Sequence, residues 1–532
     1  MGTADRSELV TLGSTRGQEV AVGLLVLAFV AFIASWAAIF QWLDVRGAYL
    51  GADLFTLFGL ALLALAAGVA AIGVGARYGP FVSNASDSAG VTVAAVFGLL
   101  WAAIVGLLAG HLVGGGAAWL GALLGAALGG GTALYPREDL GSTLPAAGVV
   151  GLLGGVIVTG LIGADWRWDP GWTEATFPGS ELVPVLVMLG ALLASWPAAK
   201  AKEGYGARGR QAGAFYLVRM TVFAMLAVLA LLIGFIVVNG LDVMLTGWSL
   251  TGGTLALPLI GEVPFLEVPF VTNVSGGLFV EIPGVMPATV GTLWLVVGSI
   301  LFSVPLGVGA AIFLTEYAEQ GRFTQLVEVA TNGLWSTPSI VFGLFGLAFL
   351  VPRISGGNSI FVGQLVLSFM MLPLVLITSR EAIKAVPDEY RDASVALGAT
   401  KWQTIRSVVV PAAMPGVITG VIIGVGRIAG ETAPLLLVFG GPPYPSSGPG
   451  VLESFAFTAQ PPFVTNEALL SPASALPYQL YSSITAGVFP KEIFTTTEFG
   501  WGTALVLLIV VLGLYGIGVA SRIHFRRKIH HE

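Results

Sequence analysis

Long runs of apolar residues dominate this sequence and leave few folds open to it. A helix needs about 20 apolar residues to cross the hydrocarbon core of a bilayer. Six such runs precede residue 200, at about 20–43, 54–75, 91–113, 117–134, 146–162 and 182–198. Six more follow, at about 215–238, 289–314, 328–351, 361–379, 415–439 and 503–520. We therefore predict an all-α polytopic protein of the cell membrane.

The composition agrees with a lipid environment. Charged residues make up 10% and hydrophobic residues 55% of the 532 residues, whereas an ordinary soluble domain has roughly 25% charged residues. So few ionic side chains cannot cover a soluble surface, which excludes a soluble enzyme, a nucleic-acid binder and a disordered scaffold. The absence of cysteine excludes disulfides, thiol catalysis and Cys-ligated metals.

The runs divide into two halves at a basic, glycine-containing stretch. We predict an additional multi-span region at 1–199, a cytoplasmic linker at 200–213 and a second membrane region at 214–525. Two longer segments of the second region are predicted outside. The segment 241–287 contains β-prone residues that favour a small hairpin, and 440–500 is expected to carry short helices.

Lys and Arg in the short loops give the orientation. The segment 241–287 has four acidic residues and no Lys or Arg. The loops predicted on the other side carry Lys200, Lys202, Arg208, Arg210, Arg380, Lys384, Arg391, Lys401 and Arg406, and the tail carries Arg522, Arg526, Arg527 and Lys528. An even number of spans in each half then places both termini in the cytoplasm.

The most informative segment lies between two predicted spans, at 388–411. We expect a helix at 389–397, a turn at Gly398 and a second short helix from Lys401 toward the next span. One face of the first helix would carry Tyr390, Ala393 and Leu397. Such an amphipathic helix-turn-helix on the cytoplasmic surface is shaped to dock on another protein.

This segment resembles the EAA loop of permease subunits of ATP-binding cassette (ABC) importers. Asp392-Ala393-Ser394 occupies the Glu-Ala-Ala position, and Gly398 and Val408-Val409-Val410-Pro411 follow at the family's spacing. Asp replaces Glu and Ser replaces Ala. The resemblance implies that the loop sits in a groove of a separate ATPase subunit and couples nucleotide-driven closure to helix motion. The coupling residues would be Tyr390, Asp392, Ala393, Ser394, Leu397, Gly398, Val408 and Pro411.

Three segments are similar to phosphate-specific transport permeases, and more to the PstA type than to the PstC type. They are Trp335–Gly346, Ala396–Ile405 and Arg427–Leu435, within a resemblance that covers about 212–525. It implies a six-helix type I (MetI-like) permease core, with the shared domain at about 288–520, preceded here by about six extra helices. The implied partners are a PstC-type permease, two ATPase subunits and an external phosphate-binding protein, and the implied substrate is inorganic phosphate.

Arg427 and Glu431 fall in an apolar run, four residues apart, and would lie on one helix face. A charge at bilayer depth costs at least about 2.5–3.5 kcal/mol, so each needs a partner or water. With Thr432 they either form a polar element on the path of an oxyanion or an ion pair that fixes helices.

Other polar residues in the spans allow two interpretations. Ser336, Thr337 and Ser339 flank Pro338, and their hydroxyls either satisfy freed backbone groups or contact a passing anion. Glu316 and Tyr317, at the end of a span, are interpreted as interfacial anchors.

No lysine follows the glycine-rich pattern of a phosphate-binding loop. ATP hydrolysis is therefore expected in a separate subunit, and no cofactor, metal or nucleic-acid partner is expected for this chain. The alternatives are a permease for another oxyanion (sulfate, molybdate or tungstate), an ion-coupled secondary transporter, or a sensor or scaffold role for the first half. Small-residue pairs such as Gly121/Gly125/Gly129 and Gly151/Gly155 predict close helix packing.

Overall fold

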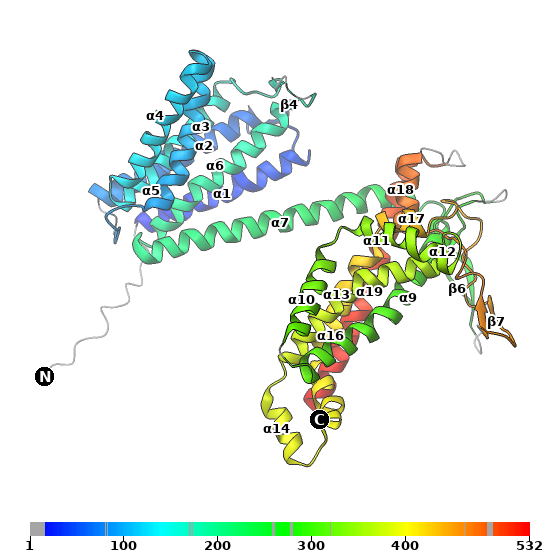
Figure 1. Cartoon of the computed structure of the whole chain (residues 1–532). Coiled ribbons are helices and arrows are strands. Elements are labelled where there is room, and N and C mark those ends of the chain that lie inside the picture. Colours follow the sequence, from blue (N-terminus) through cyan, green and yellow to red (C-terminus); the bar gives the residue numbers. More distant parts are fainter. Residues whose placement is uncertain are drawn as a thin grey trace. The chain divides into compact units, whose positions relative to one another are not determined.

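The computed structural model describes residues 16–79, 81, 83–169, 172, 174–257, 261–276, 280–319, 321–461, 463–486 and 493–531. The chain divides into two compact units, Met1–Leu229 and Ala230–Glu532, which we call the N-terminal and C-terminal units. Each unit is described by itself (Figure 1).

Each of the six predicted apolar runs of the N-terminal unit forms a helix. They are α1 (Arg16–Ile39), α2 (Leu54–Tyr78), α3 (Val91–Leu112), α4 (Gly115–Leu134), α5 (Glu138–Val158) and α6 (Gly179–Lys202). The helices pack in nested pairs, α1 on α6, α2 on α5 and α3 on α4. Two short antiparallel hairpins, β1 (Ala48–Tyr49) with β2 (Ala52–Asp53) and β3 (Arg167–Trp168) with β4 (Phe177–Pro178), lie in the connections.

Glycines let α3 and α4 approach closely, as predicted. A Cβ atom added at Gly125 would lie 2.2 Å from the carbonyl oxygen of Trp101, and one at Gly129 would lie 2.4 Å from that of Phe97. No larger side chain fits this contact, so the small-residue stripe of α4 is a packing surface. The same prediction is wrong at Gly155, where an added Cβ would meet no atom within 4 Å.

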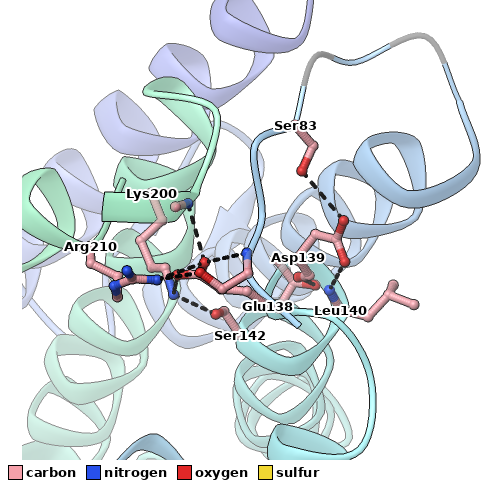
Figure 2. Close-up of polar contacts among 10 residues, drawn as sticks. Ser83, Glu138, Asp139, Leu140, Ser142, Lys200 and Arg210 are labelled. Carbon is pink, nitrogen blue, oxygen red and sulfur yellow. Dashed lines mark hydrogen bonds and ion pairs between the residues drawn. The ribbon is translucent and has the colours of Figure 1, made fainter. Parts of the chain in front are cut away.

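A buried carboxylate joins the helix ends at one end of the N-terminal unit. Glu138, at the start of α5, is fully buried and pairs with the fully buried Lys200 of α6 at 2.8 Å. Its other oxygen accepts from Arg210 at 3.1 Å and from the backbone N–H groups of Ser86 and Gly206. Figure 2 shows Lys200 and Arg210 converging on Glu138 from two sides. One carboxylate thereby connects four segments.

The neighbouring carboxylate has its own partners. Asp139 pairs with Arg137 at 3.1 Å and accepts from the hydroxyl of Ser83 at 3.4 Å, so it holds the connection between α2 and α3 (Figure 2). Lys200 also donates to the hydroxyl of Ser142 at 2.7 Å. Because the charges are paired and hydrogen-bonded, this apolar unit tolerates them.

The stretch 200–213, expected as a linker, is almost entirely helical. Only residues 203–205 separate α6 from α7 (Gly206–Met244), and Lys200 is part of the buried network. The glycines that suggested flexibility, Gly204 and Gly206, instead adopt positive φ angles of 72° and 65° in a tight turn. Helix α7 has 39 residues and runs from the N-terminal into the C-terminal unit.

The C-terminal unit is built around long helices. Its helical elements are α8 (Pro269–Thr272), α9 (Met286–Ile312), the π-helical η2 (Phe313–Tyr317), α10 (Arg322–Ser336), α11 (Ser339–Phe345), η3 (Gly346–Leu350), α12 (Val351–Ile354), α13 (Ile360–Lys384), α14 (Asp388–Ala396), α15 (Lys401–Thr404), η4 (Ile405–Val409), α16 (Val410–Ala429), α17 (Ala433–Val438), α18 (Leu476–Ala486) and α19 (Thr496–His531). Helix α13 packs between α9 and α16, and α19 packs on α16. Gln364 of α13 donates to the carbonyl of Trp294 in α9 at 2.8 Å, which satisfies a buried amide inside the core.

Two predicted spans of this unit are not continuous helices. The run 328–351 is broken between α10 and α11, whose axes differ by 102°. Pro338 lacks an N–H and holds Thr337 in an extended conformation (ψ 131°), so the helix cannot continue. The run 415–439 is broken between α16 and α17, because Gly430 ends α16 and Pro434 occupies the first turn of α17.

The long connections form small structures at one end of the C-terminal unit. The predicted hairpin in 241–287 is present as β5 (Ser249–Leu257) paired antiparallel with β6 (Gly261–Glu267). The segment 440–500 contains the expected short helix, α18, and a second hairpin of β7 (Phe455–Phe457) and β8 (Val464–Asn466). Helix α14 lies at the opposite end of this unit (Figure 1).

The helical fold class is confirmed. Within the described residues, 11 helices are long and apolar enough to cross a membrane, and the number rises to 12 when the bent pair α10–α12 is counted as one span. This count of 12 equals the number of membrane spans predicted from the sequence, six in each half.

The Glu138 network yields a stability prediction. Changing Lys200→Met leaves the buried carboxylate of Glu138 without its closest cation, and breaking a buried pair costs about 3–5 kcal/mol. We expect a clear loss in the thermal midpoint of the detergent-solubilised protein. Lys202→Met, an exposed lysine of the same helix, is the control and should change little. Removing both charges with Glu138→Leu and Lys200→Met should recover part of the loss. A midpoint for Lys200→Met equal to that of the control would contradict the assignment.

Candidate functional site

The segment 388–411 folds as the predicted helix-turn-helix. Helix α14 begins after Pro387 and ends at Ala396, and residues 397–400 form the turn into α15, η4 and then α16. Gly398 has a φ of +84°, a conformation that side chains with a Cβ rarely adopt. An added Cβ there would meet no atom within 4 Å, so only the backbone angle requires glycine at this position.

Several apolar side chains of this loop are exposed to solvent. None of the α14 residues is buried, and Leu397 is 90% exposed. Tyr390, Val395 and Trp402 are each more than half exposed. Asp392 and Ala393 are also exposed, and no ion pair is found for Asp392 among the described residues. Exposed apolar side chains gathered on one loop are typical of a surface that docks on another protein.

Hydrogen bonds hold the two arms of the loop together. The hydroxyls of Ser394 on α14 and Thr404 on α15 lie 3.0 Å apart. The hydroxyl of Thr400 caps α15, and the side chain of Gln403 accepts from the Thr400 N–H at 2.8 Å, which completes a capping box. Ser394 occupies the second alanine position of the Glu-Ala-Ala pattern, and its hydroxyl forms a hydrogen bond with Thr404 that an alanine could not form.

Arg391 attaches the loop to the body of the unit. Its guanidinium pairs with Glu316 of η2 at 3.0 Å and with Asp388 at 3.1 Å. The same group donates to the carbonyls of Val386 and Ile383, at 2.6 and 3.0 Å, where α13 ends. Local sequence patterns do not predict this role of Arg391, because its main partner is 75 positions away.

Glu316 and Tyr317, predicted as interfacial anchors, also contact the loop. Glu316 pairs with Arg391 of α14, and the ammonium of Lys401, at the start of α15, lies 4.9 Å from the centre of the Tyr317 ring. Each arm of the loop thus contacts one of two adjacent residues of η2. We call these two contacts the η2 clasp.

Val408 and Pro411 mark the entry from the loop into α16. Val408 is half-buried in η4, next to the fully buried Val409, and Pro411 lies in the first turn of α16. Pro411 directly follows the π-helical turn η4 in a continuous helical segment, and its missing N–H leaves a carbonyl of the preceding turn without an intrahelical donor. The apolar-x-apolar-Pro ending therefore anchors the loop in the helix packing.

The second predicted cluster lies where α16 ends. Arg427 is in the last turn of α16, but Glu431 lies beyond the helix end, so the two do not share a helix face as predicted. Their side chains remain within 3.9 Å. The guanidinium of Arg427 also stacks at 4.4 Å over the ring of Trp335, at the end of α10. Thr432 precedes α17 and makes no side-chain capping bond.

The hydroxyl residues beside Pro338 act mainly on the backbone. Ser336 and Thr337 both donate to the carbonyl of Gly333, at 3.0 and 2.8 Å, where the broken helix leaves an acceptor free. Ser339 is half-buried at the start of α11. The Trp335–Arg427 contact brings this broken segment beside the end of α16, which sequence spacing alone did not predict.

The C-terminal unit contains two candidate functional regions, the loop at 388–411 and the region around Arg427. The loop end of the unit exposes apolar side chains and is attached through Arg391, and the contact of α10 with α16 includes the partly exposed cation of Arg427. Among the described residues, no group of three or more His, Cys, Asp or Glu side chains could hold a metal ion.

Comparison with known proteins identifies the family. Residues 303–530 match the family described as binding-protein-dependent transport system inner membrane component. The chain is 30% identical to a probable ABC transporter permease protein, YqgI, of Bacillus subtilis, over 49% of this chain and 86% of that protein. It is 34% identical to the phosphate transport system permease protein PstA of Mycobacterium leprae, over 46% of this chain and 72% of that protein. A solved chain of the MetNI methionine ABC transporter is 18% identical and covers 44% of this chain and 93% of its own, with a TM-score of 0.34.

The match to the family's description, together with relatives covered over most of their length, settles the class of protein. This chain belongs to the family of inner membrane components of binding-protein-dependent transport systems, the permease subunits of ABC importers.

Proposed function

We propose that this permease subunit imports inorganic phosphate and couples to a separate ATPase subunit through the loop at 388–411. The observation that carries the coupling role is the exposed apolar surface of α14 and the turn after it, which has no cover within the described residues. The phosphate assignment is supported by the printed name of the Mycobacterium leprae relative and by the residues around Trp335 and Arg427 discussed above.

We assign the coupling residues as the sequence predicts them. Gly398 sets the angle between the arms, and Tyr390, Asp392, Ala393 and Leu397 present the surface for the ATPase. Ser394, Val408 and Pro411 attach the loop to the unit. The η2 clasp gives this surface a rigid connection to α9, because a charged hydrogen bond is worth roughly 1.5–3 kcal/mol.

We further assign the translocation path to the region where α10 and α16 end. Arg427 is 32% exposed and only loosely paired with Glu431, so its charge remains accessible to an oxyanion. Ser336, Thr337, Ser339 and Thr432 line the adjoining breaks. Because the hydroxyls of Ser336 and Thr337 already bind the backbone, Arg427 is the stronger candidate for anion contact.

The assembly proposed for this chain follows the family. Residues 214–525 form the transport core with a second, PstC-type permease, two ATPase subunits and an extracytoplasmic phosphate-binding protein. Both termini and the loop at 388–411 face the cytoplasm, whereas the hairpins and α18 face outside. The placement of α14 and the hairpins at opposite ends of the C-terminal unit is compatible with this orientation (Figure 1).

The first prediction concerns the turn. Gly398→Val forces a β-branched residue into a left-handed conformation, which costs about 1–3 kcal/mol at the hinge of the loop. We expect at least tenfold slower ATP-driven phosphate uptake by the assembled complex in proteoliposomes. Gly357→Val is the control, because its added Cβ also meets no atom within 4 Å and its φ is not positive. Uptake by Gly398→Val that equals uptake by the control would refute the coupling role.

A second prediction concerns the η2 clasp. Arg391→Ala removes the contacts of the loop to Glu316 and to the end of α13. The exposed surface of the loop is unchanged, so we expect the ATPase to dock. Its motion should be transmitted less efficiently to the membrane helices, because the loop is less firmly attached to them. We expect more ATP hydrolysed per phosphate imported. Arg406→Ala provides the matched control, since Arg406 is exposed and belongs to no ion pair among the described residues. An unchanged ratio of hydrolysis to uptake in Arg391→Ala would argue against the clasp.

Substrate identity is tested by competition. In the complex assembled with its own binding protein, excess unlabelled phosphate should suppress uptake of radiolabelled phosphate, and sulfate, molybdate and tungstate should not. Uptake of radiolabelled sulfate, molybdate or tungstate with no uptake of phosphate would support the alternative oxyanion. Transport that continues without any ATPase subunit would support an ion-coupled secondary transporter.

The role of Arg427 is tested by Arg427→Gln, which keeps hydrogen-bonding capacity and removes the charge. We expect phosphate uptake to fall by about tenfold or more, since a charge-assisted hydrogen bond contributes roughly 1.5–3 kcal/mol. Arg353→Gln is the control, because Arg353 also stacks on an aromatic ring, that of Phe349 at 4.0 Å. Normal uptake by Arg427→Gln would limit Arg427 to helix packing.

A further inference from the structure

A hollow opens beside the loop, at the end of the C-terminal unit that carries α14. Its volume is about 420 Å³, and its walls come from the end of α13, the start of α14, the first turns of α16 and the end of α19. We call it the α19 hollow. None of the coupling or path assignments above uses its two basic residues, Arg522 and Arg526.

Small apolar residues form most of its wall. Ala382, near the end of α13, and Ala385, just after that helix, line the hollow together with Ala412 and Gly416 of α16. The two helices are in close contact here, because a Cβ added at Gly416 would lie 2.6 Å from that of Ala382. The lining continues to Thr419, about two turns into α16, so the hollow extends along the helices toward the apolar part of the bundle.

Its other end is cationic. Arg522 and Arg526 lie one turn apart on α19, both are exposed, and neither forms an ion pair with an acidic residue within the described part of the chain. The apolar run of α19 ends near residue 520, so the Cα atoms of these two arginines lie about 3 and 9 Å beyond it along the helix axis. That is the depth at which phospholipid headgroups lie and at which basic side chains extend toward the interface.

We propose that the α19 hollow binds an anionic glycerophospholipid, with its phosphate on Arg522 and Arg526 and an acyl chain along the wall of Ala382, Ala385, Ala412 and Gly416. The two halves of the site match the two halves of this ligand. A free phosphate ion would use the arginines and leave the apolar wall in water, whereas a lipid satisfies both surfaces.

The same site lies against the coupling loop. Tyr390 of α14 lines the α19 hollow, so a bound lipid contacts the first arm of the loop and links it to α19. This consequence rests on the proposed function of the loop, whereas lipid binding itself does not. An anionic lipid would then hold α14 in its docking position, and uptake would depend on the lipid composition of the membrane.

The binding test uses the full chain in its complex, in nanodiscs of phosphatidylcholine containing phosphatidylglycerol. After mild delipidation, native mass spectrometry should find phosphatidylglycerol retained. The Arg522→Gln/Arg526→Gln double variant should retain about tenfold less, because two basic contacts are lost. Arg527→Gln is the matched control, one residue further along α19, exposed and outside the lining. Equal retention by the double variant, or equal loss in the control, would overturn the proposal.

A second variant separates lipid from free phosphate. Ala385 is exposed and lines the α19 hollow, so Ala385→Trp fills the apolar wall without entering the core. This variant should no longer retain phosphatidylglycerol, although both arginines are still present. Displacement of the bound lipid by inorganic phosphate alone, with Ala385→Trp still binding phosphatidylglycerol normally, would identify a simple anion site and overturn the proposal.

Retention is measured without ATP or transport substrate, so its outcome is independent of the phosphate assignment. Comparing uptake in phosphatidylcholine vesicles with and without phosphatidylglycerol then tests the link to the loop. A stimulation of wild-type uptake that is absent in the double variant supports the link. Equal stimulation of both proteins would contradict it.

Discussion

The need to pair every charge inside an apolar bundle organises both units of this protein. In the N-terminal unit, Glu138 and Lys200 are fully buried, and they are tolerated because each is paired and hydrogen-bonded. In the C-terminal unit, Arg391 meets Glu316 and the free carbonyls at the end of α13. These pairs all lie at helix ends, where backbone donors and acceptors are also unsatisfied. The charges therefore fix the connections between helices more than the helices themselves.

The irregular parts of the backbone gather at the functional regions. Of the three π-helical turns in the described residues, η2 forms the clasp with the loop and η4 is part of the loop's return into α16. The breaks at Pro338 and Gly430 face each other through the contact of Trp335 with Arg427. π-Helical turns and broken helices expose backbone groups and weaken regular packing, and this makes them suitable places for movement and for polar contacts within a membrane domain.

These features give the C-terminal unit a consistent mechanical organisation. The loop with α14 lies at one end, the hairpins and α18 lie at the other (Figure 1), and the contact of α10 with α16 lies where these helices break. The η2 clasp joins the loop to α9, and η4 joins it to α16. A displacement of the loop therefore reaches two long helices at once. Tyr390, on the outer arm, borders the hollow for which we propose a lipid.

The sequence by itself determined the helical class, the positions of the membrane helices and the presence of the loop. Apolar runs of sufficient length have one stable form in lipid, and the turn at Gly398 depends on a local backbone angle that glycine alone adopts easily. It also predicted that the glycine stripe of α4 would be a close packing surface, although not which helix packs there. All of these properties depend on neighbours in the chain, so a single sequence contains the information.

Only the tertiary structure decided which distant residues meet. The partner of Arg391 lies 75 positions away, and Lys200, expected in a flexible linker, is buried against a carboxylate from another helix. The breaks within two predicted spans have a local cause, because proline and glycine end a helix while the average hydropathy of the run stays high. Pairings of this kind arise from the packing of several helices at once, which no local pattern in the sequence specifies.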